Sequence, residues 1–580
     1  MNCDNKPSDL YPNCDTSIWL RSCEEEITEP INGRVIGTIP KWIKGSLLRN
    51  GPGRLKVGDM MFKHLFDSSA LIHRFHINNG EVTYQCRFIQ TETFKKNMIA
   101  KRIVVTEFGT SSVPDPCHNI FQRFSSRFKT TEKSDNTMIS IYPFGDEYYS
   151  FTESPVIHRI NIETLKTEAR VSVSDFVGIV SHTSHPHVLP NGTVYNLGLS
   201  VDLSGPRYNI ICFPNGKYMF DNAHIVASIP SRWKFFPSYM HTFSMTDNYF
   251  VIVEQPLSVS LPNLVKSNIK NEPMCSSFKW FADAQTFIYL ICRKRGQLCH
   301  TYKTDPIFYL HIINSYEDNG HVILDICTYK DPSMLDCMYI ESMRDMQNNP
   351  NYANMFRARP LRFVLPLYYR HRQIQKTPFK RSLSLMNVIP NISTNRRLSK
   401  STSFDFGKDQ QLSTVNYKKL NFHSENLVKL KGTTCTSYLL EDSTVFCEPE
   451  SLCSVGCETP RIHYDSYSGR KYRYFYAISS DVDAPNPGTL IKVDVVTKTK
   501  LTWCEPNCYP SEPIFVAGPN CQSEDDGVVL ASMVWGKTDE NRVGLLVLCA
   551  KTWTQMGRCE FTTKGPVPKC LHGWFASEKK

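Results

Sequence analysis

Three histidines occur at a repeated position, a few residues ahead of a turn. They are His185 in SHTSHPHVLPNG, His241 in PSYMHTFSMTDN and His311 in FYLHIINSYEDNG, at successive spacings of 56 and 70 residues. Such spacings match one blade of a β-propeller plus its loops, so equivalent strand positions would bring the imidazoles to one end of a common axis. A fourth, His572 in KCLHGWF, lies eight residues from the C-terminus, where a ring-closing last strand could deliver it to the same place.

Four convergent imidazoles indicate a metal site, whereas spacing alone also fits four ordinary half-buried histidines. Imidazole suits zinc, copper, iron and nickel alike, so the histidines do not identify the metal. His182 and His187 lie beside His185 and compete with it as candidates. His187 directly follows Pro186 on the same segment, and we expect it to be structural.

Three glutamates in β-rich or turn segments complete the chemistry of such a site. They are Glu153 in SFTESP, Glu458 in GCETPRIHY and Glu512 in YPSEPIFV. A metal-bound imidazole needs its second ring N–H anchored, and a carboxylate is the usual anchor. Each glutamate taken alone could be an ordinary surface residue. Together with the four histidines they become the candidate catalytic carboxylates.

The elements that position these residues are predicted to be short strands. Long helical periodicity is scarce, while β-rich runs separated by turn dipeptides recur from about residue 70 to the C-terminus, which is typical of a closed, many-stranded architecture. Hairpin turns are predicted at Asn79-Gly80, Gly145-Asp146, Asn191-Gly192, Asp247-Asn248 and Asn319-Gly320. This regular repetition favours an all-β propeller over a sandwich.

The 580 residues fit one large domain as well as several. We predict an N-terminal extension over 1–30 and a single propeller domain over 31–580. A stretch at about 371–425 is rich in Ser, Lys, Arg and Asn and poor in periodic apolar residues. It is predicted to be a disordered insertion.

Composition excludes several classes of protein. The net charge of +10 is modest for this length, and much of the basic excess lies in the insertion, so we expect no nucleic-acid partner. The N-terminus lacks a cationic start followed by an apolar run, and no run of eighteen apolar residues occurs. The 21 cysteines are scattered, and we expect reduced thiols in a cytoplasmic protein.

Several segments together resemble the carotenoid cleavage oxygenase family. They are GSLLRNGPG, TSHPH, PSYMH, YEDNG, SEPIFV, EDDGVVL and LHGWF, spread from about Ile31 to Phe575. The resemblance is to the animal branch of β-carotene oxygenases and retinoid isomerohydrolases. The segments HTSHPHVLPNGTVYNLG and GPVPKCLHGWFA are most similar to those of insect members.

The resemblance implies a seven-bladed β-propeller with a helical and loop cap over an axial metal site. It implies one Fe(II) ion (Fe2+) and no other cofactor. The implied ligands are His185, His241, His311 and His572, and the glutamates that hold three of them are Glu153, Glu458 and Glu512.

The resemblance also implies the reaction. Fe(II) and O2 would cleave the central 15,15′ double bond of a forty-carbon carotenoid, such as β-carotene or zeaxanthin, into retinal-type aldehydes. Similarity to insect members adds coupled isomerisation of one product from all-trans to 11-cis for visual chromophore synthesis. Three alternatives stay open: eccentric cleavage at the 9′,10′ bond, O2-independent retinyl ester isomerohydrolysis, and carotenoid binding without catalysis. The oligomeric state is also open.

A carotenoid dissolves in lipid, so the enzyme needs an apolar, cation-fringed entrance that rests on one leaflet. Residues 114–129 would form a helix with phenylalanines on one face, and a core-facing helix is the alternative. A second candidate combines 233–236 with 256–266. We therefore predict peripheral membrane association.

Overall fold

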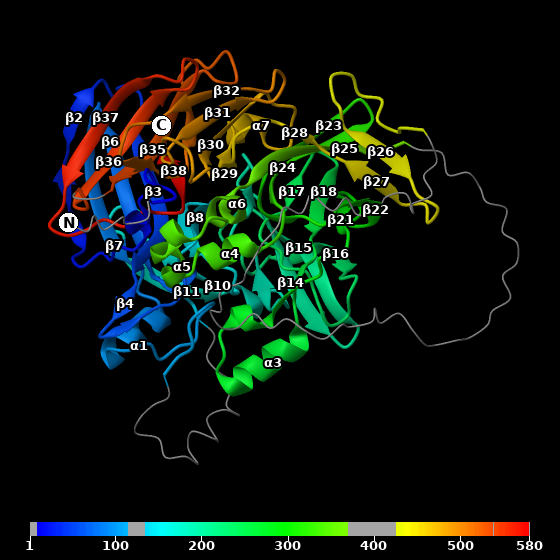
Figure 1. Ribbon diagram of the computed structural model, residues 1–580, viewed down its shortest axis with the longest axis horizontal. Coiled ribbons are helices and arrows are strands. Elements are labelled where there is room, and N and C mark those ends of the chain that lie inside the picture. Colours follow the sequence, from blue (N-terminus) through cyan, green and yellow to red (C-terminus); the bar gives the residue numbers. More distant parts are fainter. Residues whose placement is uncertain (1–8, 114–133, 369–424, 537–538, 579–580) are drawn as a thin grey trace, which may run out of the picture.

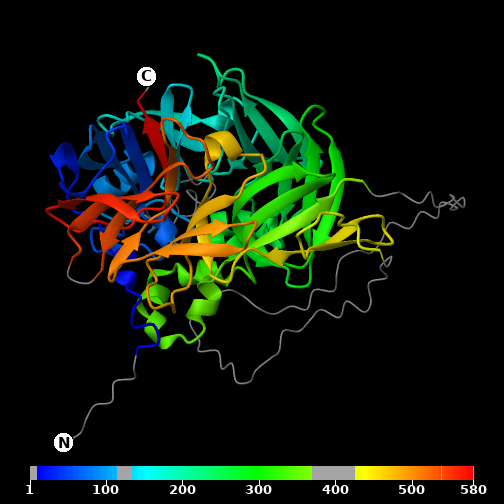
Figure 2. The ribbon, with the colours of Figure 1, turned by 90° about the horizontal axis from the view of Figure 1, so that it is seen from above.

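The computed structural model describes residues 9–113, 134–368, 425–536 and 539–578 (Figure 1). In this part of the chain, strands dominate and form seven sheets of four to six strands, with two further two-stranded sheets. Seen from above, the colours pass in order around the molecule, from blue through cyan, green and orange to red beside blue (Figure 2). The predicted seven-bladed β-propeller is confirmed.

The blades follow one another along the chain. Blade 1 contains β1 (Ile27–Asn32), β3 (Gly45–Arg54), β6 (Ser69–Asn78), β7 (Glu81–Phe88) and β38 (His572–Ser577). Blade 2 contains β8 (Ser140–Phe144), β9 (Glu147–Phe151), β10 (Val156–Ile160) and β11 (Thr167–Ser172). Blade 3 contains β12 (Ser181–His182), β13 (His187–Val188), β14 (Val194–Asp202), β15 (Gly205–Phe213) and β16 (His224–Pro230).

Blades 4 and 5 are linked to later parts of the chain. Blade 4 contains β17 (Ser244–Met245), β18 (Tyr249–Glu254), β21 (Thr286–Cys292), β22 (Leu298–Thr304), β26 (Thr436–Leu439) and β27 (Val445–Glu448). Blade 5 contains β23 (Phe308–Asp318), β24 (His321–Tyr329), β25 (Arg359–Pro366) and β28 (Glu450–Ser451).

The last two blades complete the ring. Blade 6 contains β29 (Cys457–Arg461), β30 (Tyr474–Ser479), β31 (Leu490–Asp494) and β32 (Thr499–Trp503). Blade 7 contains β33 (Cys508–Pro510), β34 (Ile514–Ala517), β35 (Gly527–Trp535), β36 (Arg542–Cys549), β37 (Gln555–Thr562) and β2 (Arg34–Gly37). The two-stranded sheets pair β4 (Lys56–Val57) with β5 (Met60–Met61) and β19 (Leu257–Val259) with β20 (Phe278–Trp280).

The ring is closed by strands from both ends of the chain. The C-terminal strand β38 pairs antiparallel with β3, in a register that places His572 opposite Asn50. The N-terminal strand β2 pairs with β37 of blade 7, with Arg34 opposite Glu560. Blade 1 is thus completed by a C-terminal strand, and blade 7 by an N-terminal strand. It also fixes His572 at the first residue of the closing strand.

The hairpin turns form where the sequence predicts them. Asn79 and Asn319 have φ values of 51° and 45°, and the glycines that follow have φ values of 85° and 75°. Positive φ at both central residues is the type I′ turn that Asn-Gly favours. Strand pairs close directly across these turns, with Asn78 opposite Glu81 and Asp318 opposite His321.

Helices are few and lie outside the sheets. They are α1 (Glu92–Ala100), α3 (Leu261–Lys270), α4 (Ser333–Cys337), α5 (Ile340–Arg344), α6 (Tyr352–Phe356) and α7 (Tyr464–Tyr467). Short 3-10 turns are η1 (Thr16–Trp19), η2 (Leu65–Asp67), η3 (Val173–Asp175), η4 (Met274–Ser277) and η5 (Met346–Asn348). Met334, Leu335 and Met338 of the α4 region pack in one core with Phe308 and Leu310 of β23, so these helices cap the inner strand of blade 5.

Two predicted segments fall outside the described residues: the lipid-contacting segment 114–129, and the insertion at 371–425 apart from its last residue.

The strand β1 begins at Ile27, and Tyr11 and Ile18 are buried. The division of the chain at residue 31 remains a prediction. None of the described helices is long and apolar enough to cross a membrane.

The prediction that residues 256–266 contact lipid is wrong for the first half of this run. Leu257 and Ser258 are buried, because β19 pairs with β20 and Ser238 bridges to Ser258. Only the part within α3 reaches the surface, where Val265 is 61% exposed. The alternation of apolar residues and serines in PLSVS therefore marks a covered strand rather than a lipid-facing surface.

Buried histidines make the stability of the fold sensitive to acid. Burial lowers the pKa of His64 to about 4 and that of His73 to about 3, from ordinary values of 6.5. His64 Nε2–H donates to the Leu335 carbonyl over 3.0 Å, which ties η2 to α4, and His64 Nδ1 accepts from the Phe66 N–H over 3.2 Å.

We expect the free energy of unfolding to fall as pH decreases from about 6.5 to 4. In this window the unfolded chain binds protons that the folded His64 and His73 do not, so stability is fully present only above the unfolded pKa. Denaturant unfolding at a series of pH values measures the effect. A His73→Phe variant should show a shallower loss than wild type, and equal slopes for the two proteins would contradict the assignment.

Candidate metal centre

Four histidines from four blades meet on the propeller axis. His185 lies between β12 and β13, His241 precedes β17, His311 lies within β23, and His572 begins β38. The ring centroid of His185 is 4.8 Å from that of His241, 5.1 Å from that of His311 and 4.6 Å from that of His572. The His311 and His572 centroids are 4.9 Å apart. The structure therefore brings together all four histidines predicted from the sequence.

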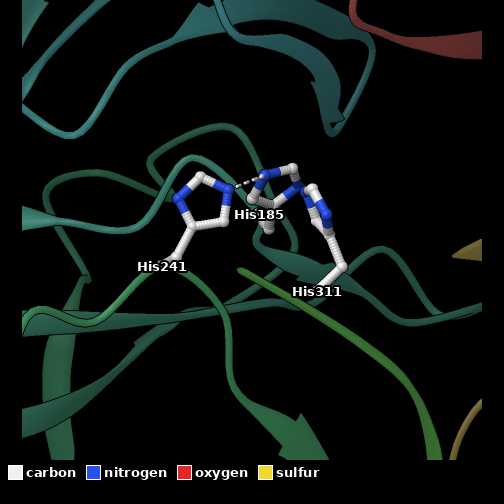
Figure 3. Close-up of side chains that lie close together, drawn as sticks. All are labelled: His185, His241 and His311. Carbon is white, nitrogen blue, oxygen red and sulfur yellow. Dashed lines mark hydrogen bonds between the residues drawn. The ribbon is translucent and has the colours of Figure 1, made fainter. Parts of the chain in front are cut away.

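The ring nitrogens of three histidines are close enough to share one ion. One nitrogen from each of His185, His241 and His311 lies within 4.8 Å of the others. Figure 3 shows these rings turned toward one another, with His185 Nε2 and His241 Nε2 separated by 3.2 Å. Metal–imidazole bonds of about 2.1 Å place two ligand nitrogens about 3.0 to 3.4 Å apart. The observed separation suits a metal between them.

Each of the three predicted glutamates holds one histidine by its Nδ1–H. His241 donates to Glu153 over 2.6 Å, His311 to Glu458 over 2.6 Å, and His572 to Glu512 over 2.8 Å. A proton fixed on Nδ1 leaves Nε2 with its lone pair free for a metal. His311 Nε2 is buried and has no hydrogen-bond partner among the described residues, so its lone pair is directed at the shared centre. The donor set therefore fits a divalent metal ion.

Two of the carboxylates accept further hydrogen bonds from neighbouring groups. The Tyr329 hydroxyl donates to Glu458 over 2.8 Å, as does the Thr459 N–H. Burial opposes the charge of Glu458, but the His311 imidazole and these donors outweigh it and hold its pKa below the ordinary range. Glu153 likewise accepts a hydrogen bond from the Tyr239 hydroxyl over 2.5 Å.

Glu512 has the most strongly charged surroundings. It accepts hydrogen bonds from Arg49 Nη1 over 3.0 Å, Arg461 Nε over 2.8 Å and the Gly573 N–H over 2.9 Å. Burial opposes ionisation here too, yet Arg461 and His572 lower the pKa of the carboxyl strongly. A side chain at Gly573 would collide with the Leu48 carbonyl, so glycine permits this approach of β38 to β3.

Comparison with known proteins agrees with this geometry. The sequence profile described as retinal pigment epithelial membrane protein matches residues 20–577. The chain is 57% identical over 582 residues to the carotenoid isomerooxygenase of Drosophila melanogaster, and the match covers 98% of this chain and 94% of that protein. It is 52% identical to the carotenoid isomerooxygenase of Galleria mellonella, with coverages of 98% and 97%.

This chain belongs to the carotenoid cleavage oxygenase family. The prediction of the family from sequence motifs is thus confirmed, and family membership supports an oxygenase enzyme. A solved structure, the cobalt-substituted apocarotenoid oxygenase of Synechocystis, has a TM-score of 0.71 at 19% identity and covers 98% of this chain and 100% of that one. At this identity the likeness shows a shared fold.

One of the two competing histidines, His187, has no nitrogen left for a metal. Its Nδ1 accepts a hydrogen bond from the Tyr464 hydroxyl over 2.9 Å, and its Nε2–H donates to the Phe243 carbonyl over 3.0 Å. Burial lowers its pKa to about 4, which keeps it neutral. His187 is structural, as expected from its place after Pro186.

Sequence reasoning missed several residues that the structure places at the centre. A cavity of about 80 Å3 borders His185, His311 and His572, and its lining includes Tyr142 and Arg461. Arg49, Tyr239 and Tyr329 contact the anchoring glutamates. Arg49 lies inside the family segment GSLLRNGPG, and Arg461 lies inside GCETPRIHY, the segment that contains Glu458. These segments could have identified both arginines as site residues. Tyr239 lies inside the family segment PSYMH, whereas Tyr142 and Tyr329 carry no comparable signal.

Proposed function

We propose that this chain is an Fe(II)-dependent oxygenase that cleaves the central 15,15′ double bond of a carotenoid with O2. We further propose that it isomerises one retinal-type product from all-trans to 11-cis, for visual chromophore synthesis. One observation carries the proposal: four imidazoles, three of them anchored by carboxylates, meet on the axis of a chain 57% identical to a carotenoid isomerooxygenase.

The proposed ligands are His185, His241, His311 and His572. Burial and the neighbouring imidazoles hold the pKa of His185 well below its ordinary value, and burial lowers that of His572 to about 4. Both imidazoles are therefore neutral at physiological pH and can act as metal ligands. Fe(II), when bound, would supply activation of O2 beside the substrate alkene. The relative solved with cobalt in place of its own metal supports a divalent ion at this kind of site.

The protein's own part is to hold the substrate and the ligand rings. Three carboxylates fix the imidazole orientation and partly offset the charge of the ion. Aromatic rings continue outward from His241: Tyr239 is 6.0 Å from it, Phe278 is 5.3 Å from Tyr239, and Phe108 is 5.5 Å from Phe278. This run of rings offers an apolar surface suited to a polyene. Holding one polyene arm twisted against it would favour isomerisation.

We also propose that the surface beside this aromatic run rests on a lipid bilayer. The Leu261 N–H donates to the Phe235 carbonyl, which joins the start of α3 to the segment 233–236. Val265 and Ile269 of α3 are 61% and 45% exposed, and Phe235 is 55% exposed. Lysines on the same helix could contact lipid headgroups. Figure 1 shows α3 at the lower edge of the molecule, on the same side as α1.

Changing Val265 and Ile269 together to aspartate should reduce binding to anionic vesicles by about tenfold or more, because two apolar side chains are replaced by charges that repel the surface. Vesicle sedimentation measures the bound fraction. The matched control is Val496→Asp with Leu501→Asp, which changes exposed apolar residues in blade 6, remote from α3. Equal binding by the two double variants would contradict the assignment of this surface.

Chromatography of reaction products tests the proposed function. Iron-loaded protein is incubated with β-carotene or zeaxanthin in detergent, under air and under anaerobic conditions. Oxygen-dependent retinal-type aldehydes that include an 11-cis isomer are expected. Longer apocarotenals would replace central by eccentric cleavage. Absence of cleavage would refute the oxygenase and favour isomerohydrolysis or binding alone.

A further inference from the structure

One ligand histidine differs from the other three in what holds its second nitrogen. His241, His311 and His572 each donate to a carboxylate over 2.6 to 2.8 Å. His185 Nδ1 instead faces the Tyr142 hydroxyl over 3.4 Å. Its Nε2 points to the shared centre, 3.2 Å from His241 Nε2. Within the described residues, no carboxylate is hydrogen-bonded to His185.

Tyr142 is placed by the propeller itself. It lies on β8, the strand at the inner end of blade 2, and its side chain is buried. The ring packs against Trp574, with a centroid distance of 5.4 Å, and against Phe151 at 6.0 Å. In other blades the inner strands, or the connections beside them, supply histidines or glutamates to the axis, and the inner strand of blade 2 supplies this tyrosine.

A second group acts on the same hydroxyl. Burial raises the pKa of the Tyr142 hydroxyl, and the positive charge of Arg461, which lines the same cavity, opposes that rise. Arg461 Nε donates to Glu512 over 2.8 Å, and its Nη2 donates to the Gly573 carbonyl over 3.0 Å. Because Glu512 holds His572, Arg461 supports the anchor of one ligand histidine while its charge acts on the hydroxyl that faces another.

We propose that Tyr142 is the positioning residue for His185. The inference rests on the proposed function, because it requires a metal at Nε2. With the metal there, Nδ1 carries the proton and donates to the hydroxyl oxygen. A neutral oxygen at 3.4 Å is a weaker acceptor than a carboxylate at 2.6 Å. The hydrogen bond that anchors His185 is therefore the weakest of the four.

The test measures Co(II) binding by full-length Tyr142→Phe. The affinity is expected to fall by about tenfold, at the lower end of the 10- to 100-fold range for residues that support metal ligands. The visible absorption bands of bound Co(II) should shift, because the His185 ring is no longer fixed. The matched control is Tyr464→Phe, which removes a hydroxyl from the same cavity that bonds His187 instead. Its affinity and spectrum should equal those of wild type.

Unchanged affinity and spectrum in Tyr142→Phe would overturn the proposal. An equal loss in Tyr464→Phe would also overturn it, because the effect would then belong to the cavity in general. Failure of the wild-type protein to bind Co(II) would instead refute the proposed metal centre. Thermal melting of the metal-free proteins checks that both variants are folded.

A measurement on wild type covers the case in which Tyr142→Phe does not fold. Proton NMR of the Co(II)-loaded protein should show four strongly shifted signals that disappear in D2O, one for each anchored imidazole N–H. Three such signals would overturn the proposal, because an unanchored His185 N–H beside a polar cavity exchanges with water too fast to be observed.

Discussion

His311→Ala is expected to lower Fe(II) affinity by more than about 100-fold and to reduce carotenoid cleavage to background. The change removes a ligand nitrogen, so its effect should exceed the 10- to 100-fold loss typical of residues that only support ligands. It also leaves the buried Glu458 without the imidazole to which it binds over 2.6 Å. Metal content after dialysis and product analysis by chromatography measure the two effects.

His187→Ala is the matched control for this prediction. His187 is a buried histidine near the same cavity, but both of its nitrogens are occupied by other groups. It should retain one iron per chain. Full iron occupancy in His311→Ala, or equal losses in the two variants, would contradict the assignment of His311 as a ligand.

Glu512→Gln should destabilise the metal-free protein by about 3 to 5 kcal/mol, the usual cost of breaking a buried ion pair by removing one partner. Arg49 is 0% exposed and Arg461 is largely buried, and both would lose the charge that compensates them. The same carboxylate holds His572 on the strand that closes the ring. Chemical denaturation of the metal-free variant and wild type measures the difference.

Glu153→Gln provides the comparison. Glu153 also holds a ligand histidine, but its side chain is 27% exposed and it is bonded to His241 and Tyr239, with no arginine among these partners. Its loss of stability should stay near or below about 1 kcal/mol. If Glu512→Gln were as stable as Glu153→Gln, the buried charges of Arg49 and Arg461 would not depend on Glu512.

The repeating features of the sequence were enough to predict the fold. Turn dipeptides and short β-rich runs indicated the propeller, and the family segments gave its seven blades. His185, His241 and His311 were found because equivalent places in consecutive blades converge on one axis. His572 required the ring-closing strand that β38 provides.

Other parts of the site depend on how different blades face one another. Tyr142 lies in SIYPFGD, where nothing in the local pattern separates it from an ordinary strand tyrosine. It reaches His185 only because blades 2 and 3 are neighbours around the axis. The burial of 257–258 has the same cause, since β19 is covered by β20 from beyond α3. Local pattern does not contain such contacts.

X-ray absorption at the iron edge of protein loaded with Fe(II) tests the central claim most directly. The account predicts one iron per chain, coordinated by four imidazole nitrogens at about 2.1 Å, with no sulfur ligand. The His311→Ala control should lose the bound iron. Fewer than four imidazoles around a tightly bound iron, or a sulfur ligand, would contradict the assignment of His185, His241, His311 and His572.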